Sequence, residues 1–377
     1  MSVHAGAGVL DLLAGLVRGR SVAGGEGALA RDAASMLDDA GFAVTLPGWQ
    51  EGREQLVARF GSTDAPLTLT GHLDTVPADP SVWSVDPWGA VRDGNRVVGR
   101  GTSDMKSGVA ALLVAATQHA RRPHDCRGVQ VVLTAGEETG CTGALALRRE
   151  DLAPGGPLLV AEPTANRLVP GHKGAHWMRL SAAGRAAHGS APELGDNAVV
   201  RLARAAVALH DHSGWPSHQT FGPVTANVGM LTGGVQPNIV PDFAELLLDV
   251  RTVPGVDAQT LRDTVTELAG ERVTVDDHVV LPVVDTSVED PFVASVQEAL
   301  SAAGQEPDPQ PPARFFTDAS VLAGLLGSED GGPAPTVVLG PGEPDQCHVV
   351  DEWCSADRVE AAVEVYAALL DAWCVQR

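Results

Sequence analysis

The chain has 377 residues, more than a single hydrophobic core usually supports, so two domains are expected. Its 44% hydrophobic and 20% charged residues exclude extended disorder. Acidic residues outnumber basic ones by 48 to 26, and the resulting net charge of −22 argues against nucleic acid as a partner, because it repels a phosphate backbone.

The first half of the chain alternates between helical and strand patterns. Its predicted elements are helices at Val9–Val17, Leu29–Ala40 and Ser107–Ala120, and strands at Gln55–Phe60, Leu67–Leu69, Val129–Leu133 and Leu158–Val160. Such alternation predicts a largely parallel sheet covered by helices. The most apolar run, Val109–Ala116, is too short to span a bilayer, so no membrane association is expected.

The order of elements changes in the middle of the chain. Strand, helix, strand, strand, helix and strand are predicted at Trp177–Ser181, Asn197–His210, Asn227–Leu231, Glu245–Val250, Ala258–Ala269 and Arg272–Val275. This is the split βαβ order of a small two-layer domain. The first pattern then resumes with helices at Pro291–Ala303, Asp318–Leu326 and Ser355–Cys374 and a strand at Thr336–Leu339. The sequence therefore predicts one domain of residues 1–173 and 286–377, with a second domain of residues 174–285 inserted into it.

The cysteines and the N-terminus bear on location. The five cysteines are widely spaced and include no Cys-x-x-Cys pair, and the first residues lack the basic and apolar regions of a signal peptide. Both features predict reduced thiols in a cytoplasmic protein.

Polar residues with metal-binding chemistry follow several of the predicted strands. In Thr70-Gly71-His72-Leu73-Asp74, alternate side chains share one side of an extended segment, so His72 can bind a metal while Asp74 orients its imidazole. Taken alone, these residues are better explained as an ordinary polar strand end. The glycine-flanked turn before the helix at Ser107 carries Asp104, which is either a metal ligand or a helix N-cap.

Two adjacent acids, Glu137 and Glu138, follow the buried strand at Val129–Leu133. Neighbouring side chains diverge, so one carboxylate can coordinate a cation while the other accepts a proton from water that the cation acidifies. A solvated pair in a loop is the simpler alternative for these two residues alone. Glu162 and His348 also follow predicted strands. Together, His72, Asp104, Glu138, Glu162 and His348 lie where open α/β sheets place their ligand sites.

On these motifs the chain resembles the M20 metallopeptidase family, which includes acetylornithine deacetylases, succinyl-diaminopimelate desuccinylases, aminoacylases and glutamate carboxypeptidases. The segments that carry the resemblance are Gly71-His72-Leu73-Asp74, Gly101-Thr102-Ser103-Asp104-Met105-Lys106, Gly136-Glu137-Glu138, Glu162-Pro163 and Gly340-Pro341-Gly342 with His348. The resemblance covers essentially the whole chain. It implies an α/β fold, with a zinc-peptidase-like catalytic domain on a mixed, largely parallel sheet and an inserted two-layer α+β dimerisation or lid domain.

The resemblance also implies roles for the residues of the motifs. It implies that His72 and Glu162 bind one zinc ion, that Glu138 and His348 bind a second, and that Asp104 bridges the two. Glu137 is then the general base, and Asp74 fixes the tautomer of His72. Cobalt or manganese can substitute for zinc at such mixed imidazole and carboxylate ligands.

Further residues resemble family segments outside the metal ligands. His188 resembles the histidine that reaches the site of the partner subunit in a homodimer and stabilises the oxyanion. Asn238, Arg251 and Thr317 resemble substrate contacts, and the planar guanidinium of Arg251 suits a carboxylate. The segment Arg314–Ser320 lacks a glycine that many relatives carry and is similar to acetylornithine deacetylase-like members, which favours N-acetylated basic amino acids.

The implied function is a dinuclear zinc amidohydrolase that removes an acetyl- or succinyl-like group from a small N-acyl amino acid. A dipeptidase or carboxypeptidase with the same mechanism is the alternative. A catalytically silent sensor of an amino-acid derivative is a different class, and the presence of all five ligands and of Glu137 argues against it.

Overall fold

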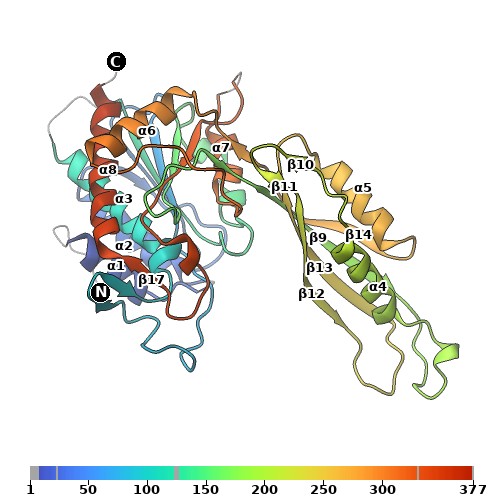
Figure 1. Cartoon of the computed structure of the whole chain (residues 1–377). Coiled ribbons are helices and arrows are strands. Elements are labelled where there is room, and N and C mark those ends of the chain that lie inside the picture. The colour runs from blue at the N-terminus through green and yellow to red at the C-terminus, as the bar shows by residue number, and fades with distance from the viewer. Residues whose placement is uncertain (1–7, 23, 123–126, 329–330, 376–377) are drawn as a thin grey trace. The chain divides into compact units, whose positions relative to one another are not determined.

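The chain forms two compact units in a computed structural model (Figure 1), which describes residues 8–22, 24–122, 127–328 and 331–375. The first unit comprises Met1–Gly171, Val284–Pro311 and Thr317–Arg377. The second comprises His172–Val283 and Pro312–Phe316. The second unit is therefore an insertion along the chain, joined by a short segment from further downstream.

A six-stranded mixed sheet forms the centre of the first unit. Its order is β1(Ala43–Thr45), β2(Leu56–Phe60), β6(Val129–Thr134), β3(Leu67–His72), β7(Leu158–Val160) and β16(Thr336–Val338). β6, β3, β7 and β16 run parallel, whereas β1 and β2 are antiparallel additions at one edge. Every residue of β3, β6, β7 and β16 is buried, as expected for strands covered on both faces. The predicted α/β class with a largely parallel sheet is confirmed.

Helices pack around this sheet, and most of them were predicted to within a few residues. They are α1(Val9–Arg18), α2(Glu26–Asp38), α3(Ser107–Ala120), α6(Pro291–Ala302), α7(Ala319–Leu326) and α8(Ala356–Val375), with short 3-10 turns at Ala144–Ala146, Arg149–Asp151 and Pro344–Gln346.

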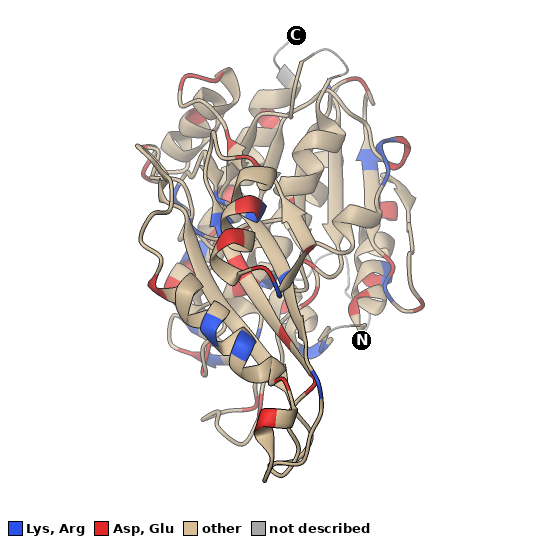
Figure 2. Ribbon diagram, turned by 90° about the vertical axis from the view of Figure 1, so that its right-hand side faces the viewer, with Lys and Arg blue, Asp and Glu red and all other residues tan. Residues whose placement is uncertain are grey.

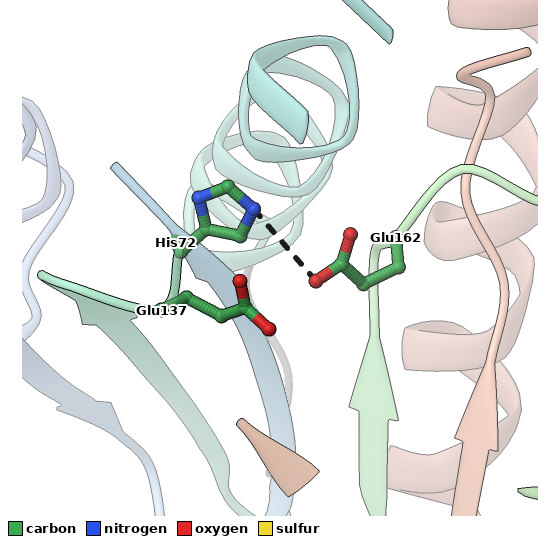
Figure 3. A group of neighbouring side chains, drawn as sticks. All are labelled: His72, Glu137 and Glu162. Atoms are coloured by element: carbon green, nitrogen blue, oxygen red, sulfur yellow. Dashed lines mark ion pairs between the residues drawn. The ribbon is translucent and has the colours of Figure 1, made fainter. Parts of the chain in front are cut away.

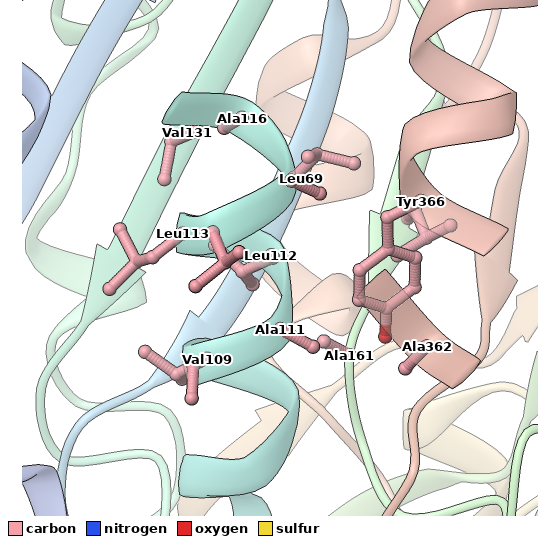
Figure 4. Packing of buried hydrophobic residues seen from close by; sticks show 14 of the residues in the cluster. Leu69, Val109, Ala111, Leu112, Leu113, Ala116, Val131, Ala161, Ala362 and Tyr366 are labelled. Carbon is pink, nitrogen blue, oxygen red and sulfur yellow. The ribbon is translucent and has the colours of Figure 1, made fainter. Parts of the chain in front are cut away.

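Helix α3 is almost wholly buried between the sheet and α8. Figure 4 shows Leu112 and Leu113 of α3 beside Leu69 of the sheet and Tyr366 of α8. The Tyr366 hydroxyl donates a hydrogen bond to the Leu339 carbonyl (2.6 Å), which satisfies its polar atom inside the core.

A small antiparallel sheet in the first unit was not predicted. It consists of β4(Val91–Asp93), β5(Arg96–Val98) and β17(Trp353–Ser355), three residues each. β17 pairs with β5, so the chain that follows His348 lies beside the segment that precedes Asp104.

The second unit is a four-stranded antiparallel sheet with two helices. Its elements are β9(Gly174–Ala183), α4(Ala198–Asp211), β12(Thr225–Gly233), β13(Phe243–Thr252), α5(Ala258–Ala269) and β14(Thr274–Leu281), in the sheet order β12-β13-β9-β14. The predicted sequence of strands and helices is confirmed here. Its core joins Met178, Leu180 and Leu246 of the sheet to Leu202 and Leu261 of the helices. The second unit also contains the short strands β10(Ser217–His218) and β11(Gly222–Pro223) and a turn at Pro192–Leu194. β8(Gly171–His172) and β15(Val284–Asp285) pair with each other where the chain passes between the two units.

Three further observations concern the predictions made from composition. Among the described residues, none of the helices is long and apolar enough to cross a membrane. Acidic residues occur in helices and loops throughout the ribbon (Figure 2). Cys141, Cys347 and Cys354 are free thiols, whereas Cys374 is disulfide-bonded, so the expectation of reduced thiols is wrong at that residue.

Candidate metal centre

The candidate ligands come together at one edge of the first unit's sheet. β3, β6 and β7 are neighbours and run parallel, so their carboxyl ends meet at the same edge. β3 ends at His72, and Glu137 and Glu162 each follow shortly after β6 and β7. Figure 3 shows these three side chains converging from the ends of their strands. His72, Glu137 and Glu162 form one group of potential ligands, and His72, Asp104 and Glu138 form another.

Asp104 lies between two histidines. Its Oδ1 is 3.1 Å from His72 Nε2, and its Oδ2 is 3.4 Å from His348 Nε2. His348 Nε2 also lies 3.2 Å from Oε1 and 3.0 Å from Oε2 of Glu138. His72 Nε2 lies 3.8 Å from Glu162 Oε1, the contact drawn in Figure 3. Each histidine thus faces Asp104 together with one glutamate of its own.

The tautomer of His72 follows from its hydrogen bond. Its Nδ1 lies 3.0 Å from the backbone carbonyl of Asp74, and a carbonyl can only accept, so Nδ1 carries the proton. Nε2 faces Asp104 and Glu162. It donates a hydrogen bond to Asp104 when it is protonated, and in the neutral imidazole its lone pair is directed at these two residues. His72 therefore presents the nitrogen that a metal ion would need.

The carboxylate of Asp74 has a second task that the sequence did not indicate. Oδ1 accepts the backbone amides of Gly136 (2.8 Å) and Glu137 (3.2 Å), and Oδ2 accepts that of Glu138 (3.1 Å). Burial acts to raise the pKa of Asp74, but hydrogen bonds from His72 and from these amides lower it overall. Asp74 therefore fixes the turn that carries the two adjacent glutamates, while its own carbonyl holds His72.

Glycine is required where this turn begins. Gly136 has φ of 75°, and a Cβ there would lie 2.3 Å from the Thr142 hydroxyl oxygen. The turn follows β6 directly, and the two adjacent glutamates leave it toward different residues. Glu137 lies with His72 and Glu162, whereas Glu138 contacts His348.

The electrostatics of the cluster favour a bound cation. Burial raises the pKa of Glu137, Glu138 and Glu162, and nearby carboxylates raise it further, while His72 lowers it. Burial also acts on Asp104, but hydrogen bonds from His348 and His72 lower its pKa overall. A divalent cation among these oxygens would stabilise their ionised forms. Imidazole nitrogens with carboxylate oxygens are ligands that zinc accepts, so the residues fit the predicted metal.

Two buried acids near the cluster were missed by the sequence analysis. Asp318 precedes α7, and one of its oxygens accepts a hydrogen bond from the Thr134 hydroxyl at the end of β6. Burial raises the pKa of Asp318 to about 6. Glu352 accepts hydrogen bonds from the turn that holds Asp104. Neither residue directly follows a predicted strand or lies in one of the motifs, so the signals that indicated the candidate ligands were absent.

The predicted substrate residues are divided between the two units. Thr317, in the first unit, is buried, and its hydroxyl accepts the Ala319 amide (3.1 Å). His188 and Asn238 are exposed neighbours in the second unit, where the Gly189 amide donates to the Asn238 carbonyl (2.7 Å). The Arg251 guanidinium is paired with Asp249 (Nε to Oδ1, 2.9 Å) and lies over the Phe316 ring, so part of its hydrogen-bonding capacity is already used.

Known proteins resemble this chain in sequence. The sequence profile of Peptidase family M20/M25/M40 matches residues 68–372. An acetylornithine deacetylase of Vibrio campbellii is 29% identical over 361 residues, which cover 90% of each chain.

Solved structures share the fold. An M20 family metallo-carboxypeptidase from Sulfolobus solfataricus has a TM-score of 0.80 at 19% identity, with 97% of this chain and 99% of that chain covered. A Bacillus subtilis protein described as a dinuclear metal binding peptidase from the M20 family has a TM-score of 0.68 at 14% identity, with 96% of each chain covered.

Proposed function

Because the chain belongs to peptidase family M20/M25/M40, whose members are metal-dependent hydrolases, we propose that it removes the acyl group from a small N-acyl amino acid at a centre of two zinc ions. The observation that carries the proposal is the position of Asp104 between His72 and His348, each beside a glutamate of its own. The Vibrio campbellii relative named acetylornithine deacetylase supports an N-acetylated substrate.

Two pairs of side chains are suited to hold the ions. His72 and Glu162 would hold one ion, Glu138 and His348 the other, and Asp104 would be shared between the two. The separate contacts of the Asp104 oxygens with the two histidines support this division. When bound, the ions would polarise the amide carbonyl and lower the pKa of the attacking water.

Glu137 is suited to move the proton. Its carboxylate accepts a proton from the attacking water as the water oxygen bonds to the amide carbon. The carbon–nitrogen bond then breaks, and Glu137 returns the proton to the leaving nitrogen. The products are a free carboxylate from the acyl group and a free amine. Burial, which raises the pKa of Glu137, makes the carboxylate a stronger base for this task.

A homodimer formed through the second unit is part of the proposal. β12 is an edge strand of its sheet, and 55% of the surface of its Met230 and 41% of that of its Leu231 are accessible to solvent. On α4, 60% of the surface of Val207 is accessible. Exposed apolar residues on an unpaired edge are typical of an interaction surface. In such a dimer, His188 of one subunit would stabilise the oxyanion in the site of its partner, with Asn238, Arg251 and Thr317 contacting the substrate.

The substrate distinguishes the proposal from its alternatives. A carboxypeptidase or dipeptidase would use the same metal centre, and the fold shared with the Sulfolobus carboxypeptidase is compatible with either. A silent sensor would bind metal and ligand without hydrolysis. Cobalt or manganese in place of zinc would leave the proposed roles of the residues unchanged. The cytoplasmic location stays a prediction.

The first test is a substrate panel on purified protein loaded with zinc or cobalt. We expect the highest kcat/KM for N-acetylated basic amino acids, lower values for N-succinyl amino acids and the lowest for dipeptides. A chelator should abolish hydrolysis, and added zinc or cobalt should restore it. Faster cleavage of dipeptides than of N-acyl amino acids would favour the peptidase. Absence of any hydrolysis by metal-loaded protein would favour the sensor. Full activity in metal-free protein would refute the metal centre.

A further inference from the structure

Glu352 is a buried carboxylate that accepts hydrogen bonds from the turn carrying Asp104. Its Oε1 accepts the backbone amides of Ser103 (2.7 Å) and Asp104 (3.1 Å). Its Oε2 accepts the backbone amide of Gly101 (2.9 Å) and the Arg100 guanidinium (2.7 Å). The residue has no exposed surface. Both oxygens are therefore fully used by one segment of five residues.

The turn that Glu352 holds does not have regular helical geometry. Thr102–Lys106 forms one wide helical turn before α3, but Asp104 (φ −119°, ψ 94°) and Met105 lie outside helical backbone angles. The amides of Gly101, Ser103 and Asp104 lie at the N-terminal end of this turn, where a helix has no carbonyls of its own to accept them, so they need another acceptor. Glu352 is this acceptor. One of the amides that it accepts belongs to Asp104, whose side chain faces both histidines of the metal centre.

The same segment of chain also carries His348. Glu352 follows His348 by four residues and precedes β17, which pairs with β5 just before Arg100. The Ser103 hydroxyl adds a second link, because it donates to the Trp353 carbonyl (2.7 Å) and accepts the Glu343 amide (2.9 Å). The backbone that carries His348 and the backbone that carries Asp104 are therefore fixed to each other through Glu352 and its neighbours.

A purely structural ion pair with Arg100 is the simpler interpretation. It accounts for one of the four hydrogen bonds, and it does not require the other three to fall on backbone amides that lead up to Asp104. Asp74 makes the corresponding set of bonds to the turn of Glu137 and Glu138. The turn of Asp104 and the turn of Glu137 and Glu138 are thus each held by a buried carboxylate from elsewhere in the chain.

We propose that Glu352 is a positioning residue, which holds the turn of Asp104 so that this carboxylate stands at a fixed place between His72 and His348. The role rests on the proposed two-metal centre. It predicts that loss of Glu352 weakens metal binding directly, apart from any effect on catalysis. Residues that orient metal ligands typically contribute about 10- to 100-fold to metal affinity.

The variant Glu352→Gln tests this role at constant side-chain size. A glutamine has one accepting oxygen, so two of the four donors lose their acceptor. Gln130→Met is the matched control: Gln130 is equally buried in the first unit and bonds the Ala153 amide (2.8 Å) and the Thr68 hydroxyl (3.1 Å), away from the ligand turns. Glu352→Asp keeps the charge on a shorter side chain and serves as the conservative variant if Glu352→Gln does not fold.

The measurement is cobalt titration of metal-free protein, followed by visible absorption, with circular dichroism as the check of folding. We expect Glu352→Gln to bind cobalt about 10- to 100-fold more weakly and with an altered spectrum, Glu352→Asp to lie between it and wild type, and Gln130→Met to match wild type. Unchanged affinity and spectrum in Glu352→Gln, or an equal loss in Gln130→Met, would overturn the role of Glu352 alone. Failure of the wild type to bind cobalt would overturn the proposed function and this role together.

Discussion

Glu137 and Glu138 are adjacent in sequence but differ in their surroundings. Glu138 contacts His348, whereas Glu137 is buried near His72 and Glu162. The proposal makes Glu137 the proton carrier and Glu138 a ligand. Glu137→Gln should therefore keep its zinc but lower kcat by about 100- to 10,000-fold, because an amide cannot accept the proton. Metal analysis and steady-state kinetics on the same sample measure the two quantities separately.

The control for this prediction is Glu138→Gln. It should lose zinc as well as activity, since it removes a ligand that pairs with His348. The test is sharp because the oxygens of Glu137 also lie within reach of a metal ion held by His72 and Glu162. Zinc loss in Glu137→Gln with zinc retained in Glu138→Gln would mean that the two residues have the opposite roles.

How far residues could be predicted depended on where they lie relative to strands. His72, Glu138 and Glu162 follow buried apolar strands, which the sequence reveals, so their convergence could be anticipated from the geometry of parallel sheets. Glu352 precedes a strand of three residues and acts through backbone amides far away in sequence. No local pattern indicates such a contact, and only the folded chain reveals it.

At the scale of elements, the turn after β6 depends on Asp74 rather than on its own sequence. Three successive amides of this turn, at residues 136–138, donate to the Asp74 carboxylate. Asp74→Asn should free at least one of them, because an amide nitrogen cannot accept a hydrogen bond. We expect faster hydrogen exchange at these amides and metal affinity lowered about 10- to 100-fold. Exchange measured on metal-free protein separates this effect from metal loss.

Asp74→Asn also distinguishes two roles for this residue. The motif predicted that the carboxylate of Asp74 acts on His72, yet His72 Nδ1 lies closer to the backbone carbonyl of Asp74 (3.0 Å) than to its carboxylate (3.6 Å). A backbone carbonyl is unaffected by the substitution. If the carboxylate acted mainly on the imidazole, exchange at residues 136–138 would remain as in the wild type while metal binding declined.

The elements themselves could be predicted where apolar periodicity extends over enough residues. α3 and α5 match their expected bounds, since each has a clear apolar pattern over 12 residues or more. β4, β5 and β17 have three residues each, too few for any period to be recognised, and they owe their pairing to the packing of the surrounding chain. The wide turn at Thr102–Lys106 could not be predicted for a related reason, because it is held by Glu352 from outside.

At the scale of the molecule, the change from mixed to antiparallel sheet marks the second unit. The sequence indicated the change of element order, but it did not indicate that Pro312–Phe316 joins that unit. This segment contains Phe316, whose ring contacts Trp177 of β9 (5.8 Å between centroids) and the Arg251 guanidinium. Such aromatic contacts between distant segments have no signature along the chain.

The exposed side chain of His188 supports the last prediction, which concerns the dimer. Among the described residues, the side chain of His188 forms hydrogen bonds with Ser190 alone, and both involve Nδ1 (2.7 Å to Oγ). Its Nε2 is therefore available to a partner molecule. If it stabilises the oxyanion of the partner subunit, His188→Ala should lower kcat by about 100- to 1,000-fold with its zinc intact.

A Glu137→Gln subunit still offers a working His188. Co-expression of the two inactive variants should then recover about one quarter of the wild-type rate, because half of randomly assembled dimers are mixed and each has one complete site. Differently tagged subunits allow the mixed dimers to be isolated and assayed. Isolated mixed dimers no more active than either parent would show that His188 serves its own subunit or none.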